Sequence, residues 1–146
     1  MRLLLTLLTA ILFANPSFAS SEKWESNSVD SMEASSIVTL KIFENGYGEK
    51  NIGIIFPSDE CDSFKKIPMN APSYYINNTK VQIMAQCLAK NVRMDFPKTD
   101  AGRDYLINEL KTKDKVVYKQ DDASITFSTK GFTNAYNSYE SEGGGL

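Results

Sequence analysis

The chain has 146 residues and a formal net charge of −2, from 16 Lys and Arg against 18 Asp and Glu. This balance argues against nucleic acid or anionic lipid as a partner, because both require a basic surface. The sequence contains no histidine, which removes the usual general base, triad base and metal ligand from the candidates for chemistry.

The first nineteen residues have the pattern of a secretory signal peptide. Met1-Arg2 is a short positive start, and the run from Leu3 to Ala14 is almost entirely apolar. Asn15-Pro16 breaks the run, and Ser17-Phe18-Ala19 places small residues at the two positions that a signal peptidase reads. The run is too short for a membrane anchor, which needs about 20 apolar residues. We therefore expect cleavage after Ala19 and export to the periplasm.

The mature chain fits a single domain. Cleavage leaves 127 residues with 15 Lys and Arg against 18 Asp and Glu, a size that suits one hydrophobic core. We expect one exported domain over residues 20–140 and a disordered tail over residues 141–146, which holds three glycines. Ser20 to Ser31 fits either a loose lead-in or a first edge strand with Trp24 packed inward.

A β-hairpin is predicted first. Ile37 to Phe43 is rich in β-branched and apolar residues, and Asn45-Gly46-Tyr47-Gly48 is a strong turn signal. Asn51 to Phe56 forms the return strand, with its even-numbered apolar residues on one face. Tyr47 lies at the tip of this turn, where its side chain can project into a partner.

The two cysteines, Cys61 and Cys87, are expected to form a disulfide. An exported domain with two cysteines usually pairs them, and the bridge would stabilise the fold by about 3.5 kcal/mol on the chain-entropy model. A metal site or a redox pair is the weaker alternative, because the sequence lacks CxxC and histidine. We expect an irregular loop from Asp59 to Pro72, a short strand from Tyr74 to Ile76, and a return strand from Val81 to Leu88.

The rest of the chain alternates strands and helices. Val92, Met94 and Phe96 alternate with polar residues as in a strand, and Thr99 is a good N-cap for a helix that ends near Lys113. Two further strands and a short helix follow, at 116–118, 124–127 and 132–139. This order predicts an α+β domain of mainly antiparallel sheet, with six or seven strands, one central helix and a short C-terminal helix.

The sequence contains no motif that identifies a reaction. The sequence has no GxSxG, no glycine-rich phosphate loop and no HExxH. Asp59, Glu60 and Asp62 are adjacent on one loop, whereas a glycosidase needs two carboxylates that face each other across a cleft. Their spacing also matches no calcium loop. We expect a solvated acidic loop, with no catalytic residue, no metal site and no cofactor.

Two segments carry a resemblance to a known group of proteins. The segment from Phe96 to Tyr105, together with Phe127 and Lys130-Gly131-Phe132, resembles periplasmic immunity proteins that accompany type VI secretion effectors. The resemblance implies a binding protein rather than an enzyme. Its partner would be a peptidoglycan-degrading toxin with a muramidase-like domain. The resemblance also implies that a homodimer can form, since an exposed sheet edge can pair with its twin.

Two surfaces are candidates for contact with such a partner. One is the first hairpin, with Tyr47 and Glu49, and the other is the acidic loop, with Asp59, Glu60 and Asp62. An inhibitor of this kind would insert a loop into the toxin's active-site cleft and exclude substrate. The alternative is a periplasmic accessory or small-ligand-binding protein without a toxin partner. That alternative predicts an enclosed apolar pocket, whereas the inhibitor predicts a protruding polar loop. An enzyme that uses carboxylates is the third and least supported interpretation.

Overall fold

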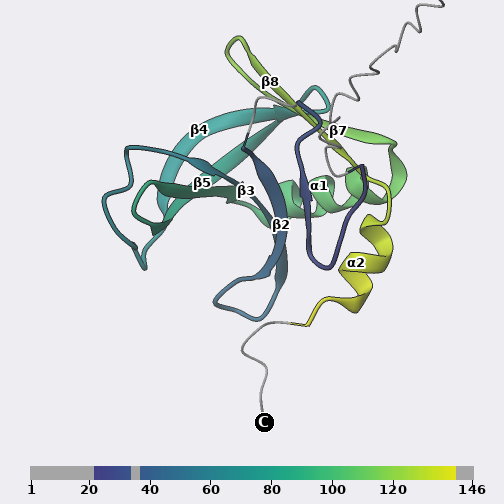
Figure 1. Cartoon of the computed structure of the whole chain (residues 1–146), viewed down its shortest axis with the longest axis horizontal. Helices are drawn as coiled ribbons and strands as arrows, with labels where there is room; N and C mark the ends of the chain where they lie inside the picture. Colours follow the sequence, from purple (N-terminus) through teal and green to yellow (C-terminus); the bar gives the residue numbers. More distant parts are fainter. Residues whose placement is uncertain (1–21, 34–36, 141–146) are drawn as a thin grey trace, which may run out of the picture.

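The computed structural model describes residues 22–33 and 37–140 (Figure 1). The predicted signal peptide over residues 1–19 and the predicted tail over residues 141–146 lie outside the described residues. Neither of the helices formed by the described part of the chain is long and apolar enough to cross a membrane.

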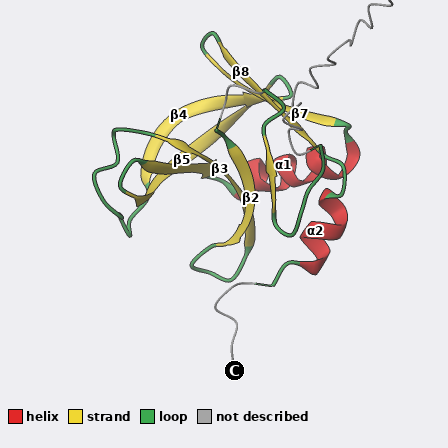
Figure 2. Ribbon diagram, viewed as in Figure 1, coloured by secondary structure: helices red, strands yellow, loops and turns green. Residues whose placement is uncertain are grey.

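The described residues form one antiparallel sheet of eight strands and two helices (Figure 2). The strand order is β1-β2-β3-β6-β5-β4-β7-β8, so the α+β class is confirmed and the sheet has slightly more than the expected six or seven strands. The strands are β1 (Ser28–Asp30), β2 (Thr39–Glu44), β3 (Lys50–Pro57), β4 (Met69–Ile76), β5 (Thr79–Ala89), β6 (Val92–Pro97), β7 (Lys115–Gln120) and β8 (Ala123–Ser128), and the helices are α1 (Asp100–Thr112) and α2 (Phe132–Ser138).

The N-terminal segment brings the two ends of the sheet together. The backbone N–H of Met32 donates to the carbonyl of Thr126 in β8 at 2.9 Å, and that of Trp24 donates to Lys130 at 2.8 Å. Trp24 is buried, donates its indole N–H to the carbonyl of Ser128 at 3.0 Å and packs edge-on against Phe132. Of the two alternatives for this segment, the edge strand with Trp24 packed inward is therefore the observed one.

The concave face of the curved sheet carries the hydrophobic core. Alternate residues of β2, β3 and β5 point to this face because side chains in a strand alternate between its two sides. Helix α1 closes the core, and its N-cap is confirmed, since the Thr99 hydroxyl accepts a hydrogen bond from the Gly102 N–H at 3.0 Å. The core residues of these elements are Leu40, Ile42, Ile52, Ile54, Val81, Ile83, Leu106 and Leu110.

Strand β6 turns its apolar residues away from this core. Asp95 is paired with the core residue Ile54, so Asp95 and Arg93 face inward, while Met94 lies on the outer face. The outer face accommodates Met94 because β3 carries Gly53 beside it: a Cβ atom there would lie 2.5 Å from the Met94 sulfur. The predicted alternation of β6 is confirmed, but the polar side of the strand is the one that points inward.

Strand β4 begins earlier than the sequence indicated. It starts at Met69 rather than at Tyr74, and a β-bulge lies between Ala71 and Tyr74. The bulge and Pro72 interrupt the regular alternation of a strand, so the expected loop from Asp59 to Pro72 is wrong at its end, where Met69 to Pro72 belong to β4. Tyr74 points towards the core and Tyr75 is exposed.

Candidate functional site

The tip of the β2–β3 hairpin is a preformed turn. The side-chain oxygen of Asn45 accepts hydrogen bonds from the backbone N–H groups of Tyr47 at 2.9 Å and Glu49 at 3.0 Å. Gly48 adopts a φ of 77°, a left-handed conformation that favours glycine, and donates its N–H to the Asn45 carbonyl. The turn therefore presents Tyr47 on an ordered backbone, and the Tyr47 side chain is 92% exposed.

Glu49 ties the hairpin to helix α1. Its carboxylate accepts hydrogen bonds from the Asn45 amide at 3.0 Å and from the Arg103 guanidinium at 2.7 Å. The Asn45 bond, followed by the Arg103 bond, holds the pKa of Glu49 below its usual value. Arg103 also lies 3.4 Å from Asp100. Glu49 is thus ionised, its charge is paired with Arg103, and it supports the hairpin. Tyr47 is the residue of the hairpin that protrudes.

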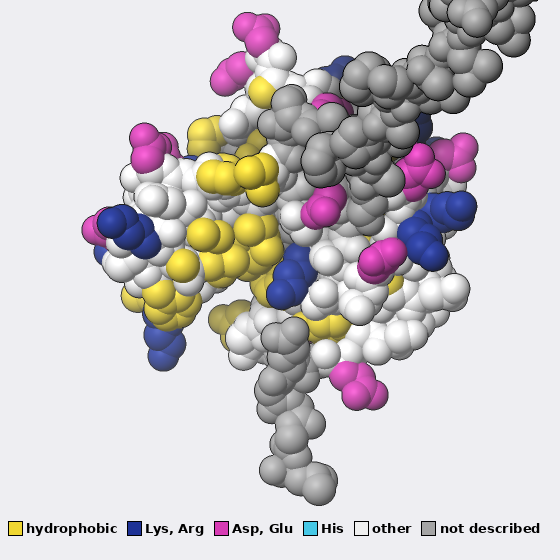
Figure 3. All heavy atoms as spheres, viewed as in Figure 1, with side chains coloured by type: hydrophobic (Ala, Val, Ile, Leu, Met, Phe, Trp, Pro, Cys, Tyr) yellow, Lys and Arg dark blue, Asp and Glu magenta, His cyan; other side chains and the backbone are white. Residues whose placement is uncertain are grey.

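A cleft of about 740 Å³ lies beside the hairpin tip. Its floor on the outer face of the sheet includes Phe43 and Phe96, whose ring centroids are 5.4 Å apart in an edge-on contact. The loop between β3 and β4 contributes Lys66 and Pro68 to the opposite wall. Figure 3 shows a hollow between these two protruding parts, with hydrophobic side chains gathered beside it. Further lining residues are Glu44, Asn45, Tyr47, Glu49, Asn51, Gln86, Lys98, Asp100 and Arg103.

The acidic loop borders a different cleft. Asp59 and Glu60 line a cleft of about 550 Å³ together with Arg93, and the Glu60 carboxylate forms an ion pair with the Arg93 guanidinium. Asp62 pairs with Lys65 at 3.1 Å; hydrogen bonds from Ser63 and then Lys65 hold its pKa below the usual value. Within residues 22–33 and 37–140, no three His, Cys, Asp or Glu side chains are placed to hold a metal ion. The structure therefore separates the two predicted partner surfaces.

The Cys61–Cys87 disulfide is present and pins the loop between β3 and β4. The two Cα atoms are 5.4 Å apart, and both cysteines are buried. Backbone bonds reinforce the attachment, since Asn91 donates to the Cys61 carbonyl at 2.7 Å and Lys65 donates to the Cys87 carbonyl at 3.0 Å. Disulfides of this kind form and persist in an oxidising compartment, such as the periplasm or the cell exterior.

A buried polar network lies at the inner face of β6, and sequence reasoning missed it. Asp95 accepts hydrogen bonds from the Tyr74 hydroxyl at 2.7 Å and from Arg93 Nε at 2.7 Å. Burial is the largest single influence and lowers the pKa of Arg93, but the hydrogen bonds and the charge of Asp95, together with Glu60 and Tyr74, outweigh it and raise that pKa. The network joins β4 to β6 and, through Glu60, to the pinned loop. The only signal in the sequence is the Arg-x-Asp spacing, which also occurs on solvated strand faces.

Two core tyrosines give the stability of the fold an alkaline limit. Burial, followed by the charge of Asp95, raises the pKa of Tyr74 above its usual value, and burial raises that of Tyr118. A raised folded-state pKa means that the stabilisation is fully present below the unfolded value of about 10 and is lost as the pH rises above it. Above that pH, ionisation of each tyrosine in the unfolded chain lowers the free energy of unfolding by about 1.4 kcal/mol per pH unit.

Urea unfolding at about pH 9 and about pH 11 measures this effect. The substitution Tyr118→Phe is expected to reduce the loss between the two pH values, because it removes one titrating group. Tyr75→Phe is the matched control: Tyr75 is exposed, so this variant should lose as much stability as the parent chain. An equal alkaline loss in the Tyr118→Phe variant would contradict the assignment.

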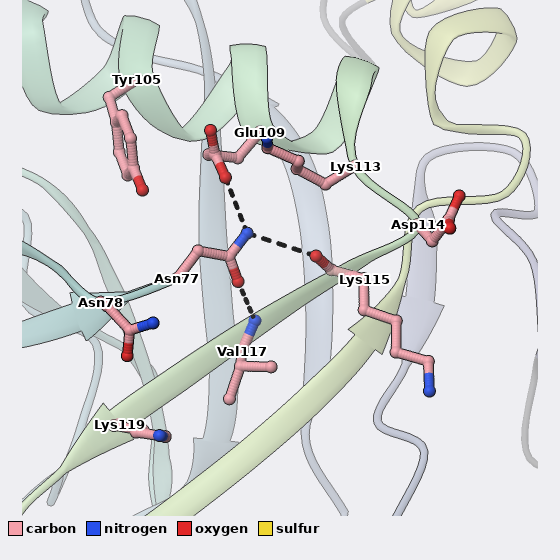
Figure 4. A pocket seen from close by; sticks show the side chains of 9 residues that line it. All are labelled: Asn77, Asn78, Tyr105, Glu109, Lys113, Asp114, Lys115, Val117 and Lys119. Carbon is pink, nitrogen blue, oxygen red and sulfur yellow. Dashed lines mark hydrogen bonds between the residues drawn. The ribbon is translucent and has the colours of Figure 1, made fainter.

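A third cleft, of about 490 Å³, lies between α1 and β7 (Figure 4). The Asn77 amide donates to the Glu109 carboxylate at 2.8 Å and to the Lys115 carbonyl at 3.3 Å, and its oxygen accepts from the Val117 N–H at 2.8 Å. Asn77-Asn78-Thr79 has the spacing of an N-glycosylation sequence. Because the Asn77 amide nitrogen is already committed to α1 and β7, its bonds would have to break before a glycan could be attached.

Comparison of the chain with models of protein families, with curated proteins and with solved structures finds no match.

Proposed function

We propose that this chain is a periplasmic immunity protein that binds a secreted peptidoglycan-degrading toxin and blocks its active-site cleft. The observation that carries the proposal is Tyr47, a 92% exposed aromatic side chain on a hairpin whose backbone Asn45 fixes. Exposed tyrosines on ordered backbones are typical anchors of protein interfaces. A preformed loop also avoids much of the entropy that a flexible loop loses on binding.

Three further features support an exported inhibitor. The N-terminal sequence is typical of a signal peptide, and the Cys61–Cys87 disulfide suits an oxidising compartment. The cleft beside Tyr47 opens at the surface between two protruding segments, unlike the enclosed apolar pocket expected of a small-ligand carrier.

The test is an inhibition assay with the mature chain. The genes beside that of this chain are searched for one that encodes a muramidase domain, and the domain found there is purified. The loss of turbidity of purified peptidoglycan is then followed with increasing amounts of the mature chain. We expect hydrolysis to stop at an equimolar ratio. The chain reduced with dithiothreitol serves as a comparison for the role of the pinned loop.

Two outcomes would overturn the proposed function. One is that hydrolysis continues unchanged at a large molar excess of the mature chain. The other is that no gene for an envelope-degrading enzyme neighbours the gene of this chain.

A further inference from the structure

The cleft beside the hairpin combines features that a solvated sheet face does not need. Its floor is aromatic, with Phe43 and Phe96 only partly buried. Both of its rims carry exposed apolar side chains: Tyr47 is 92% exposed on one side, and on the other Ile67, between the lining residues Lys66 and Pro68, is 80% exposed. Exposed apolar patches with a polar or charged rim are typical of interaction sites.

The position of these anchors indicates the size of the ligand. A pocket for a small molecule buries its apolar groups inside the cavity. Here two highly exposed apolar residues stand at the rims: Tyr47, which lines the cleft, and Ile67, which lies between the lining residues Lys66 and Pro68. Only a ligand wider than the cleft can cover both. Tyr47, Phe43 and Phe96 offer aromatic faces to a sugar or to a side chain, but Ile67 on the other rim offers none. A ligand that contacts both rims is therefore better met by a protein than by a glycan strand.

The charges around the cleft are unevenly neutralised. The carboxylates of Glu49 and Asp100 are paired with Arg103. In contrast, Lys66 and Lys98 form no salt bridge with any residue in the described ranges, and the Lys98 ammonium donates to the Asn70 amide oxygen at 2.9 Å. The lining holds three cationic and three acidic side chains, so it is neutral overall, but Lys66 and Lys98 are its two cations without an ion pair among the described residues. A carboxylate of a partner is therefore complementary to these two lysines rather than to the lining as a whole.

We propose that this cleft is the toxin-binding surface, and that it receives a protruding loop of the toxin in which an apolar side chain is flanked by a carboxylate. The apolar side chain rests on Phe43 and Phe96 between Tyr47 and Ile67, and the carboxylate meets Lys66 and Lys98. This inference rests on the proposed function and names the surface that performs it. Asp59 and Glu60 lie at the other cleft and Asp62 is paired with Lys65, so these acidic residues take no part.

The pinned loop has a defined role in this arrangement. The Cys61–Cys87 bridge and the bond from Lys65 to the Cys87 carbonyl fix the chain immediately before Lys66 and Ile67. The Gln86 amide of β5 donates to the Lys65 carbonyl at 3.1 Å and holds the same segment against the sheet. Both rims of the cleft are thus ordered before the partner arrives.

The test measures the affinity of the mature chain for the same muramidase domain by calorimetry, alongside inhibition. Tyr47→Ala and Ile67→Ala are each expected to weaken binding about tenfold or more. The chain offers matched controls in Tyr75 and Ile37, which are also exposed but lie outside the cleft. Tyr75→Ala and Ile37→Ala should change the affinity by less than about twofold.

Charge reversal tests the second half of the proposal. The double variant Lys66→Glu, Lys98→Glu should slow association about tenfold at low salt, and added salt should reduce the difference. The matched control is Lys115→Glu, Lys119→Glu, which reverses two lysines at the cleft between α1 and β7. Unfolding midpoints close to that of the parent chain verify that these surface variants are folded.

The outcomes separate this inference from the proposed function. If the parent chain inhibits and the Tyr47→Ala and Ile67→Ala variants bind equally well, the inference is overturned and the proposed function stands. If the parent chain neither binds nor inhibits, both fall. Gel filtration that shows a dimer lost on Ile67→Ala would assign the cleft to a second copy. Co-sedimentation with peptidoglycan that depends on Tyr47 would assign it to glycan, and either result overturns the inference.

Discussion

Replacing Arg93 by alanine is expected to lower the free energy of unfolding by about 3 kcal/mol or more. Asp95 is 1% exposed, and Arg93 is its only cationic partner among the described residues. Without the guanidinium, the carboxylate keeps the hydrogen bond from Tyr74 but loses its compensating charge. An unpaired buried charge is costly because the protein interior solvates it far less well than water does.

Urea unfolding followed by the fluorescence of Trp24, the only tryptophan in the chain, measures this loss. Arg103→Ala is the matched control. The side chains of Arg93 and Arg103 are 16% and 15% exposed, but Arg103 pairs with Glu49, whose side chain is 47% exposed. An exposed pair is worth about 0–1 kcal/mol, so the control should lose much less stability. Similar losses in the two variants would refute a special role for the burial of Asp95.

A double substitution tests the physical cause. If the loss in Arg93→Ala comes from the unpaired carboxylate, then Arg93→Met combined with Asp95→Leu removes both charges and should recover much of the stability. If the double variant is as unstable as Arg93→Ala, packing rather than charge accounts for the loss. In the double variant the hydroxyl of Tyr74 also loses its acceptor, Asp95. This loss costs about 1–3 kcal/mol, so the recovery of stability is expected to be incomplete.

The local structure could be predicted where the signal lies within a few residues. Asn45-Gly46 marks a turn whatever lies elsewhere in the chain, and Thr99 caps a helix through its own neighbours. The alternation of Val81, Ile83 and Cys87 identified the face that carries the disulfide. Each of these features depends on backbone preferences or on side-chain period, and both can be read from a short window of sequence.

The strand order and the buried network could not be predicted because they depend on distant residues. The period of β6 separates Arg93 and Asp95 from Met94, but a period of two does not say which face is inward. That choice follows from the position of β6 between β3 and β5 and from Gly53, which makes room for Met94 on the outer face. The candidate cleft could not be predicted for the same reason, because it lies between a hairpin tip and a loop some twenty residues further along the chain.

Removal of the disulfide is the second large effect. In the variant Cys61→Ala, Cys87→Ala, the free energy of unfolding is expected to fall by about 3.5 kcal/mol, because the unfolded chain regains the freedom of a loop with a sequence separation of 26. Two alanines are preferred to a single substitution, since one remaining thiol could cross-link two copies. Denaturant unfolding of the oxidised parent and of the variant measures the difference.

The loss should also be local. The amide of Lys65, which donates to Cys87, should exchange with deuterium faster in the variant, while the amide of Ile54 in the sheet follows only the global stability. Glu60→Gln is the matched control, because it weakens the ion pair with Arg93 and leaves the bridge intact. The Glu60 side chain is 70% exposed, so this control should lose at most about 1 kcal/mol. If the Lys65 amide exchanged as fast in Glu60→Gln as in the variant without the disulfide, the ion pair and not the bridge would hold the rim of the cleft.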